Sequence, residues 1–348
     1  MSVASPWAPE GWIRPELAAQ AREVAGSVGG SLGLARDLEE FALTPGTPSW
    51  PALATLATLG SVDLTTARTI EPHLDAIGIL RQAEVPFTAA GSTWGVYAAN
   101  PPGTRLTALR GAGGTWLLNG TKPWCSLADR VSHALVTATD AQDGDNRLLA
   151  VALRQPGVAV GTAPWVARGL REVTTGTVTF ADVPADAVGG PGWYLERPGF
   201  AHGGIGVAAV WFGGAAALAG SLWESARRRP PDQIAHLHLG ACDVALHTAL
   251  LALRDAAGAI DDGRAEGDSG RVLAARVRAV VAGAAQEVLT RVGHALGPGP
   301  LAHDAVHAAR VADLTLYLRQ HHAERDLAAL GRSVTDSGTS DAIRAGPA

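Results

Sequence analysis

The sequence predicts an α+β protein with an N-terminal α-helical domain at residues 1–88, a middle β-sheet domain at 89–190 and a C-terminal four-helix bundle at 191–333. A disordered tail is expected at 334–348. Three observations lead to this class. Apolar residues recur at helical spacing up to about residue 85, short runs with turn residues between them begin near residue 89, and helical spacing returns after about residue 198.

The N-terminal domain is expected to contain several short helices. Leu74, Ile77 and Leu80 show the spacing of three or four residues that is typical of one helical face. The expected helices are 15–28, 35–43, 50–59, 64–69 and 72–82.

The β domain is predicted from runs rich in Val, Thr and Leu, which often alternate with polar residues. The glycine-rich segment 111–114 is expected to join two of these strands as a hairpin. A turn-rich segment at 184–198 should then lead into the bundle. The expected strands are 93–98, 105–110, 115–119, 132–139, 147–153, 158–163 and 175–180.

Four helices are expected in the C-terminal part, at 203–223, 234–251, 271–296 and 302–330. In the second of these, one face combines five apolar residues with a single polar one, Thr248, and is predicted to be the core-facing stripe. The apolar members are Ile234, Leu237, Ala241, Val244 and Leu251.

Composition excludes several functions. The chain has 47% hydrophobic residues, a net charge of -5 and a pI near 6.1, so it has no basic face that indicates nucleic acid. Two distant cysteines, Cys125 and Cys242, cannot form a disulfide framework or a metal quartet, which favours a reducing cytoplasm. The N-terminus lacks the pattern of a secretory signal. The uncharged segment 203–223 is long enough for a membrane span, but its many Gly and Ala residues favour burial in the bundle, and no membrane partner is expected.

Three motifs suggest chemistry that their context does not support. Gly204-Ile-Gly-Val-Ala-Ala209 resembles a dinucleotide-binding loop, but no apolar strand precedes it. The Gly-x-Ser-x-Gly string at 29–33 follows a helical stretch and not a strand, so we interpret it as a flexible connection between helices. The histidine pairs lack a HExxH motif, and no metal site is expected. These pairs are His236 and His238, His303 and His307, and His321 and His322.

The run Trp116-Leu-Leu-Asn119-Gly120-Thr-Lys122-Pro-Trp124-Cys125-Ser126, followed by Ala128-Asp129, resembles the acyl-CoA dehydrogenase family. There a hairpin strand carries Asn-Gly-x-Lys-x-Trp-Ile-Thr/Ser. The resemblance continues at Gly169-Leu-Arg171 and Val178-Thr-Phe-Ala-Asp-Val-Pro184, and it covers nearly the whole chain. It implies the fold of that family, with a β-barrel-like middle domain.

The resemblance also implies FAD as the cofactor. The tryptophan matched by Trp124 packs beside the isoalloxazine, and the hydroxyl residue matched by Ser126 lies near flavin N5, with Cys125 between them. An aromatic face and a hydroxyl donor are physically suited to a flavin ring. Ala98 and Asn100 lie where relatives carry Thr-Glu-Pro beside the flavin, and here the segment reads Tyr97-Ala-Ala-Asn-Pro101.

Two further positions are matched to residues that reach the FAD pyrophosphate of a neighbouring subunit. They are Arg229, after the first bundle helix, and Gly297, before the last helix. The resemblance therefore implies a homodimer or homotetramer, or a hetero-oligomer with a paralogue.

The catalytic glutamate of many relatives is replaced. The nearest candidate after Asp313 is His321, and no acid occurs in 203–223, where other relatives place the glutamate. A histidine can act as a base at neutral pH. We expect an FAD-dependent oxidoreductase acting on a CH–CH bond of an acyl thioester or similar substrate, with His321 as the catalytic residue. The alternatives are a flavin-dependent monooxygenase of the same fold and a non-catalytic partner subunit of a hetero-oligomeric acyl-CoA dehydrogenase.

Overall fold

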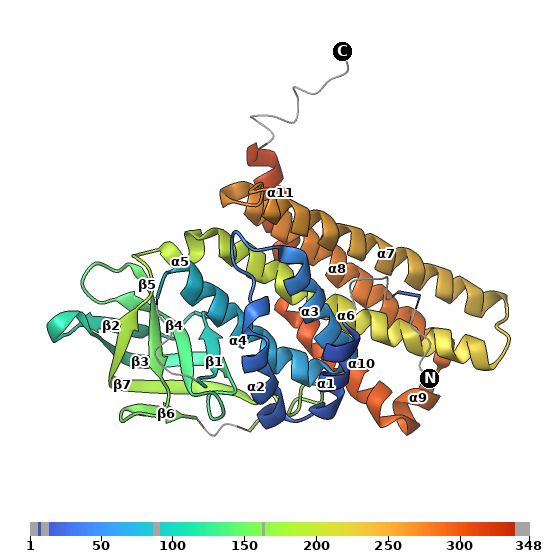
Figure 1. Cartoon of the computed structure of the whole chain (residues 1–348), viewed down its shortest axis with the longest axis horizontal. Helices are drawn as coiled ribbons and strands as arrows, with labels where there is room; N and C mark the ends of the chain where they lie inside the picture. The colour runs from blue at the N-terminus through green and yellow to red at the C-terminus, as the bar shows by residue number, and fades with distance from the viewer. Residues whose placement is uncertain (1–5, 8–13, 86–90, 162–163, 338–348) are drawn as a thin grey trace, which may run out of the picture.

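The computed structural model describes residues 6–7, 14–85, 91–161 and 164–337. The β domain lies at the left of Figure 1, helices α1–α4 lie in the middle, and the long helices α6–α8 extend to the right. The order expected from the sequence, helices then sheet then bundle, is confirmed.

The N-terminal domain consists of α1 (Pro15–Glu23), α2 (Val28–Asp37), the 3-10 turn η1 (Glu39–Phe41), α3 (Ser49–Val62) and α4 (Leu64–Gln82). Helix α4 was expected as two helices separated near Pro72. It is one helix, because a proline removes a single backbone hydrogen bond and both flanks of α4 are buried. The flexible connection expected at 29–33 was also wrong, since these residues belong to α2, whose N-cap Ser27 accepts a hydrogen bond from Gly30 N.

Among the described residues, the β domain has seven strands, close to those predicted: β1 (Trp94–Tyr97), β2 (Leu106–Arg110), β3 (Trp116–Ser126), β4 (His133–Asp140), β5 (Asn146–Ala152), β6 (Val158–Val160) and β7 (Thr175–Ala187). The 3-10 turn η2 (Ala112–Gly114) joins β2 to β3. Strand β7 continues through Pro184, which was expected in a turn. The order is β1-β4-β2-β3-β7-β5, and β4 also pairs with β5, which closes a small barrel-like sheet. The expected residues 162–163 of the sixth strand lie outside the described part.

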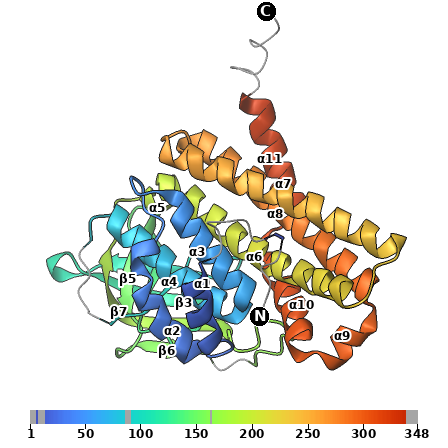
Figure 2. The ribbon, with the colours of Figure 1, turned by 45° about the vertical axis from the view of Figure 1, so that its right-hand side comes forward.

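The C-terminal part contains α5 (Trp193–Glu196), α6 (Pro198–Arg228), α7 (Gln233–Asp261), α8 (Gly267–Leu296), α9 (Pro298–His303), α10 (Ala305–Tyr317), the 3-10 turn η3 (Leu318–Gln320) and α11 (Glu324–Ser337). The single last helix expected at 302–330 is broken twice. Asp304 caps α10 by accepting hydrogen bonds from Val306 N and His307 N, and α10 ends in η3 at His321. Helix α11, at the top of Figure 2, includes residues 334–337 of the expected tail, whereas 338–348 are not described.

Helices α6 and α3 cross with their backbones in contact. A Cβ on Gly213 would lie 2.1 Å from the Ala57 oxygen, and one on Gly60 would lie 2.4 Å from the Val210 oxygen, so only glycine fits at both places. By length and composition alone, α6 and α7 could each cross a membrane, but 78% of the apolar window of α6 is buried in the protein. The burial expected for 203–223 is confirmed.

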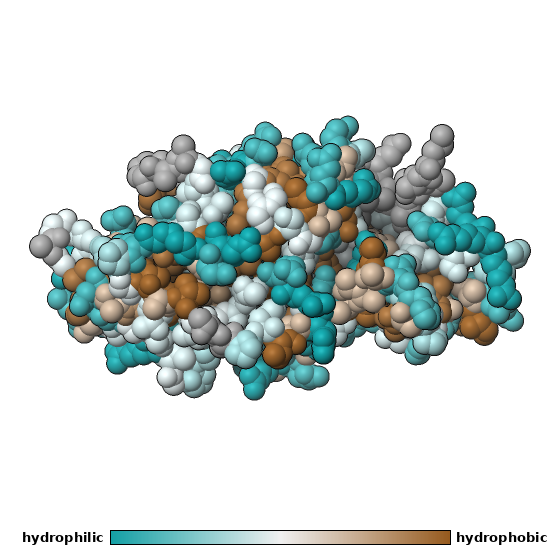
Figure 3. All heavy atoms as spheres, turned by 90° about the horizontal axis from the view of Figure 1, so that it is seen from below, coloured by the Kyte–Doolittle hydropathy of each residue, from teal (hydrophilic) through white to brown (hydrophobic). Residues whose placement is uncertain are grey.

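The core face predicted for α7 was wrong. Ile234, Leu237, Val244 and Leu251 are exposed by 51% to 69% of their surface. The buried side of α7 instead carries Cys242, Leu246, Ala249 and Leu253, because this helix is apolar on more than one face and spacing alone does not choose between them. Elsewhere, on the face shown in Figure 3, hydrophobic and hydrophilic residues are interspersed.

Candidate active site

Strand β3 holds the tryptophan and serine that the resemblance assigned to a flavin. Its Asn119-Gly120 pair forms an irregularity in the pairing with β7, and a Cβ on Gly120 (φ +117°) would lie 2.3 Å from Arg105 O. A second irregularity lies between Lys122 and Cys125. It places Trp124 at φ +59° with 65% of its surface exposed. An exposed tryptophan in a left-handed conformation is not explained by packing within this chain.

Ser126 ends β3 and lies beside polar groups of neighbouring strands. Its Oγ lies 2.9 Å from Thr175 Oγ1 on β7, and its carbonyl accepts a hydrogen bond from the Tyr97 hydroxyl at 3.0 Å. Cys125, between Ser126 and Trp124, is buried, and burial raises the pKa of its thiol to about 12, so it is not a reactive thiolate.

The buried amine of Lys122 connects β3 to the segment after β1. Its Nζ donates to Asn100 Oδ1 at 2.6 Å and to the carbonyl and hydroxyl of Thr137 at 2.7 Å. Burial lowers the pKa of Lys122 to about 8. The expected residues Ala98 and Asn100 are thus held close to the Trp124 strand, although Ala98 contributes only its backbone carbonyl, 3.4 Å from Thr137 Oγ1.

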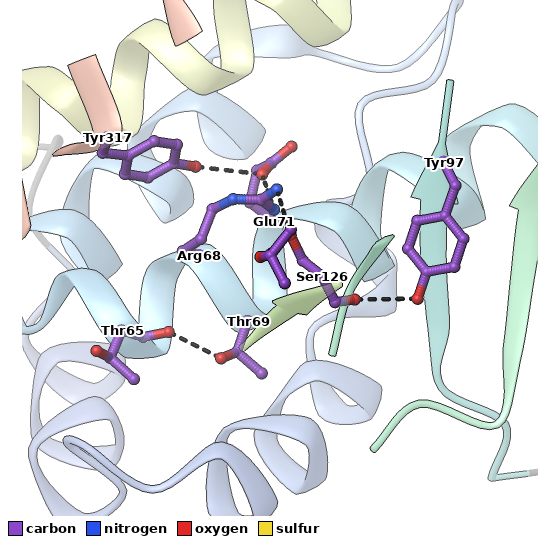
Figure 4. A network of polar contacts seen from close by, with 8 residues as sticks. Thr65, Arg68, Thr69, Glu71, Tyr97, Ser126 and Tyr317 are labelled. Carbon is purple, nitrogen blue, oxygen red and sulfur yellow. Dashed lines mark hydrogen bonds and ion pairs between the residues drawn. The ribbon is translucent and has the colours of Figure 1, made fainter. Parts of the chain in front are cut away.

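A polar network links Ser126 to the helices (Figure 4). Arg68 of α4 donates to Ser126 Oγ at 3.4 Å and pairs with Glu71 Oε2 at 3.2 Å. The Tyr317 hydroxyl donates to the same Glu71 oxygen at 3.2 Å. Burial raises the pKa of Glu71, and Arg68 partly opposes that effect. The end of β3 is therefore connected through α4 to the end of α10.

Glu71 also lies at the edge of a cavity of about 400 Å³ between α4, α6, α8 and the segment from His321 into α11. Acidic and basic side chains lie in its wall among apolar ones. They are Glu71, Asp75, Arg197, Arg271, Arg278, His321 and Asp326. Burial raises the pKa of Asp75 too, while Arg197, 3.8 Å away, lowers it.

His321 lies in this cavity wall and not on a polar helix surface, as the predicted helix would have placed it. Its residue surface is 9% exposed, and its ring meets Trp211 edge to face with centroids 6.5 Å apart. Nε2 makes no hydrogen bond to the described residues and lies 3.9 Å from Asp326 Oδ2. Burial lowers the pKa of His321, with Asp326 opposing, which favours the neutral imidazole.

Arg229 and Gly297 belong to a second place in the fold. Arg229 is exposed at the C-cap of α6, and Gly297 (φ +65°) joins α8 to α9. A cavity of about 310 Å³ at this end of the bundle is lined by Arg229 and by Leu296, which precedes Gly297. Figure 1 shows β3 and α9 at opposite sides of the molecule. The chain therefore does not bring the two groups of expected cofactor residues together.

Sequence reasoning missed Glu71, Asp75 and Arg278. The two carboxylates are four residues apart in α4, and this spacing places them on one face. That pattern was a usable signal. Arg278 gave none, because arginines are frequent in α8 and only the packing of α6 and η3 singles this one out. No group of three or more His, Cys, Asp or Glu that could hold a metal occurs among the residues that the structure describes.

The motifs and the fold point to one family. Residues 97–183 match the acyl-CoA dehydrogenase middle domain, and residues 190–319 match the acyl-CoA dehydrogenase C-terminal domain. The chain belongs to the acyl-CoA dehydrogenase family. It is 32% identical over 119 residues to the human mitochondrial short-chain specific acyl-CoA dehydrogenase, in a match covering 31% of this chain and 28% of that protein.

Solved structures share the fold over most of the chain. Butyryl-CoA dehydrogenase from Megasphaera elsdenii is 18% identical with a TM-score of 0.74, covering 92% of this chain and 94% of that one. Dibenzothiophene monooxygenase from Paenibacillus sp. A11-2 is 16% identical with a TM-score of 0.76, covering 91% and 94%. KijD3, solved with FMN and a dTDP-linked sugar, is 20% identical with a TM-score of 0.75, covering 93% and 91%. The fold thus serves flavin-dependent enzymes of different chemistry.

The residues present fit a flavin. The fit is judged from Trp124, which is largely exposed and lies two residues before Ser126 on β3. The Ser126 hydroxyl in turn lies against that of Thr175. A planar aromatic ring could stack on the indole while the hydroxyls donate to its polar edge.

Proposed function

We propose that this chain is a flavin-dependent oxidoreductase of the acyl-CoA dehydrogenase type, which oxidises a CH–CH bond of an acyl thioester or similar substrate with FAD as its cofactor. The observation that carries the proposal is His321, an imidazole that lines a cavity and that the resemblance makes the nearest candidate for the role of the family's glutamate. A chain of polar contacts runs from Ser126 through Arg68 and Glu71 to Tyr317. It supports a connection between the residues expected beside the flavin and this cavity.

His321 is assigned the role of proton acceptor. The carbon-hydrogen bond next to the thioester carbonyl breaks, Nε2 takes the proton, and the electron pair forms the new carbon-carbon double bond. When bound, the flavin accepts the second hydrogen as hydride. Asp326 near Nε2 can stabilise the imidazolium that results. A positioned base of this kind contributes about 10²- to 10⁴-fold to rate.

The test is anaerobic titration of the flavin-loaded protein with acyl-CoAs of different chain lengths. The flavin absorbance should bleach, and His321→Gln should slow bleaching by about 10²-fold or more because no base remains. His322→Gln is the matched control, since the His322 side chain is 66% exposed and does not line the cavity. Equal slowing by the two variants, or no bleaching by any acyl-CoA in the wild-type protein, would count against the proposal.

We also propose that the working form is an oligomer, a homodimer or homotetramer. The separation of Trp124 and Ser126 from Arg229 and Gly297 supports a cofactor held between chains. The exposed apolar residues of α7 support a further covered surface. Light scattering of the purified protein tests this. A protein that is colourless alone and binds flavin only with a glutamate-bearing paralogue would favour the partner-subunit alternative.

A flavin-dependent monooxygenase is the second candidate. It is favoured by His321, which replaces the expected carboxylate base, and by the acids and arginines among the lining residues, which could bind polar groups of a substrate. This candidate predicts substrate hydroxylation that requires reduced flavin and oxygen. Supplying reduced flavin, oxygen and a substrate panel, and finding no oxygenated product by mass spectrometry, would remove it.

A further inference from the structure

The close ion pairs around the cavity leave one arginine out. Glu71 pairs with Arg68 at 3.2 Å, and Asp75 lies 3.8 Å from Arg197. Asp326 lies beside His321 and His322 at 3.9 and 3.4 Å. Glu71 and Asp75 are therefore already paired with arginines, while Asp326 lies beside the two histidines.

Arg278 is the cavity arginine with no acid at ion-pair distance among the described residues, although Asp326 and Glu71 act on it from farther away. Within the described part of the chain, its half-buried guanidinium forms no ion pair. It donates only to backbone carbonyls, from Nη1 to Gly204 at 3.1 Å and from Nη2 to Gln320 at 3.0 Å. Arg271, the other arginine that α8 contributes to the cavity, differs because it is exposed and paired with Asp268.

The surroundings of Arg278 hold its side chain in place. The guanidinium lies 4.7 Å from the ring centroid of Trp211, a fully buried side chain of α6. Burial lowers the pKa of Arg278, and Asp326, Tyr317 and Glu71 partly oppose that effect. A guanidinium has five N–H donors, and the two carbonyl bonds leave donors free for an anion.

We propose that Arg278 binds a carboxylate of the substrate, so that the substrate class is a carboxylate-bearing acyl compound such as a dicarboxylic acyl thioester. That this acyl compound is oxidised rests on the proposed function, whereas the carboxylate site is inferred only from the residues of the cavity. The planar fork of an arginine matches the two oxygens of a carboxylate. A cavity of about 400 Å³ has room for a short acyl chain with such a group.

Binding to the wild-type protein without substrate turnover tests the site directly. Glutarate and its neutral isostere glutaramide are titrated by calorimetry, followed by inorganic phosphate. Glutarate should bind about 10- to 100-fold more tightly than glutaramide, since a hydrogen bond to a charged group contributes about 1.5–3 kcal/mol. Equal affinity for the two compounds, or binding of phosphate in preference to glutarate, would overturn the proposal.

Variants locate the site. Arg278→Gln should lose the preference for glutarate, and Arg278→Lys should retain part of it because the charge remains but the fork is lost. Arg276→Gln is the control, because Arg276 is an exposed arginine of α8 that does not line the cavity. A loss in Arg276→Gln as large as in Arg278→Gln refutes the assignment. If Arg278→Gln does not fold, the comparison of glutarate with glutaramide on wild-type protein still decides.

Flavin reduction separates this inference from the proposed function. If glutarate binds but no acyl-CoA bleaches the flavin, the carboxylate site holds and the proposed function fails. If acyl-CoAs without a terminal carboxylate bleach the flavin as fast as glutaryl-CoA does, the proposed function holds and the carboxylate site fails.

Discussion

Asp313 offers a quantitative test of how the bundle holds the β domain. This carboxylate on α10 is 9% exposed and accepts a hydrogen bond at 2.5 Å from Leu170 N, in the loop that precedes β7. Burial raises its pKa from 3.8 to about 6, more than the bond from Leu170 lowers it. Asp313→Asn keeps an oxygen acceptor for Leu170 and removes the buried charge.

The sign follows from the direction of this shift. A carboxyl group whose pKa is higher in the folded state stabilises the fold most when it is protonated, and this contribution is lost as the pH rises through about 6. A shift of about 2 units is worth about 3 kcal/mol in total, and about 1.4 kcal/mol of it falls between pH 5 and pH 8. The wild-type protein should therefore lose about 1.4 kcal/mol relative to Asp313→Asn over that range.

Urea unfolding of both proteins at pH 5 and pH 8 measures this difference. Asp304→Asn is a control of opposite sign, because hydrogen bonds from His307 N and Val306 N lower the pKa of Asp304 at the start of the same helix. A difference between wild type and Asp313→Asn that does not change with pH, or that favours the wild type as pH rises, would refute the argument.

Three further predictions concern the β domain and the helix packing. Trp124→Leu should change the free energy of unfolding by less than about 0.5 kcal/mol, because Trp124 is 65% exposed. The same substitution should weaken flavin binding about 3- to 10-fold, as followed by flavin fluorescence, because the indole is free to stack on the flavin. Lys122→Met should cost about 3 kcal/mol in urea unfolding, because the amine donates to three buried or half-buried acceptors. Gly169→Ala should lower the free energy of unfolding by about 1–3 kcal/mol or more, since the new Cβ would lie 2.1 Å from the Ala312 oxygen. Gly283→Ala, in open space on α8, should raise the free energy of unfolding by about 0.5–1 kcal/mol.

The order of domains and the strands could be predicted from the sequence, because alternation and turn residues are local signals. The family motif also proved to have a structural basis. The Asn119 side-chain amide donates to Asp182 Oδ1 at 2.9 Å, and Asp182 N donates to Asn119 Oδ1 at 3.0 Å. These two hydrogen bonds hold β3 against β7. The roles assigned to Trp124, Ser126 and His321 stay predictions, although the structure gives each of them a setting that suits the role.

What the sequence did not predict depends on contacts between distant segments. The buried face of α7 was misassigned because an exposed apolar stripe and a buried one have the same spacing. The break at His321 depends on how Tyr317 docks against Glu71, 246 residues away. The unpaired state of Arg278 depends equally on where α6 and η3 place their carbonyls.

The glycine crossing of α3 and α6 has a mechanical consequence. Where the two helices cross, backbone lies against backbone with no side chain between that could change rotamer, so they should move as one body. Helix α4 follows α3 after only Asp63, and the α4 and α6 walls of the cavity are thereby coupled. Motion that admits a ligand should therefore arise mainly on the opposite wall, where α11 packs on α8 near the end of the described chain. Amide hydrogen exchange should be faster in α11 than in α3 or α6, and a bound carboxylate should slow it there first.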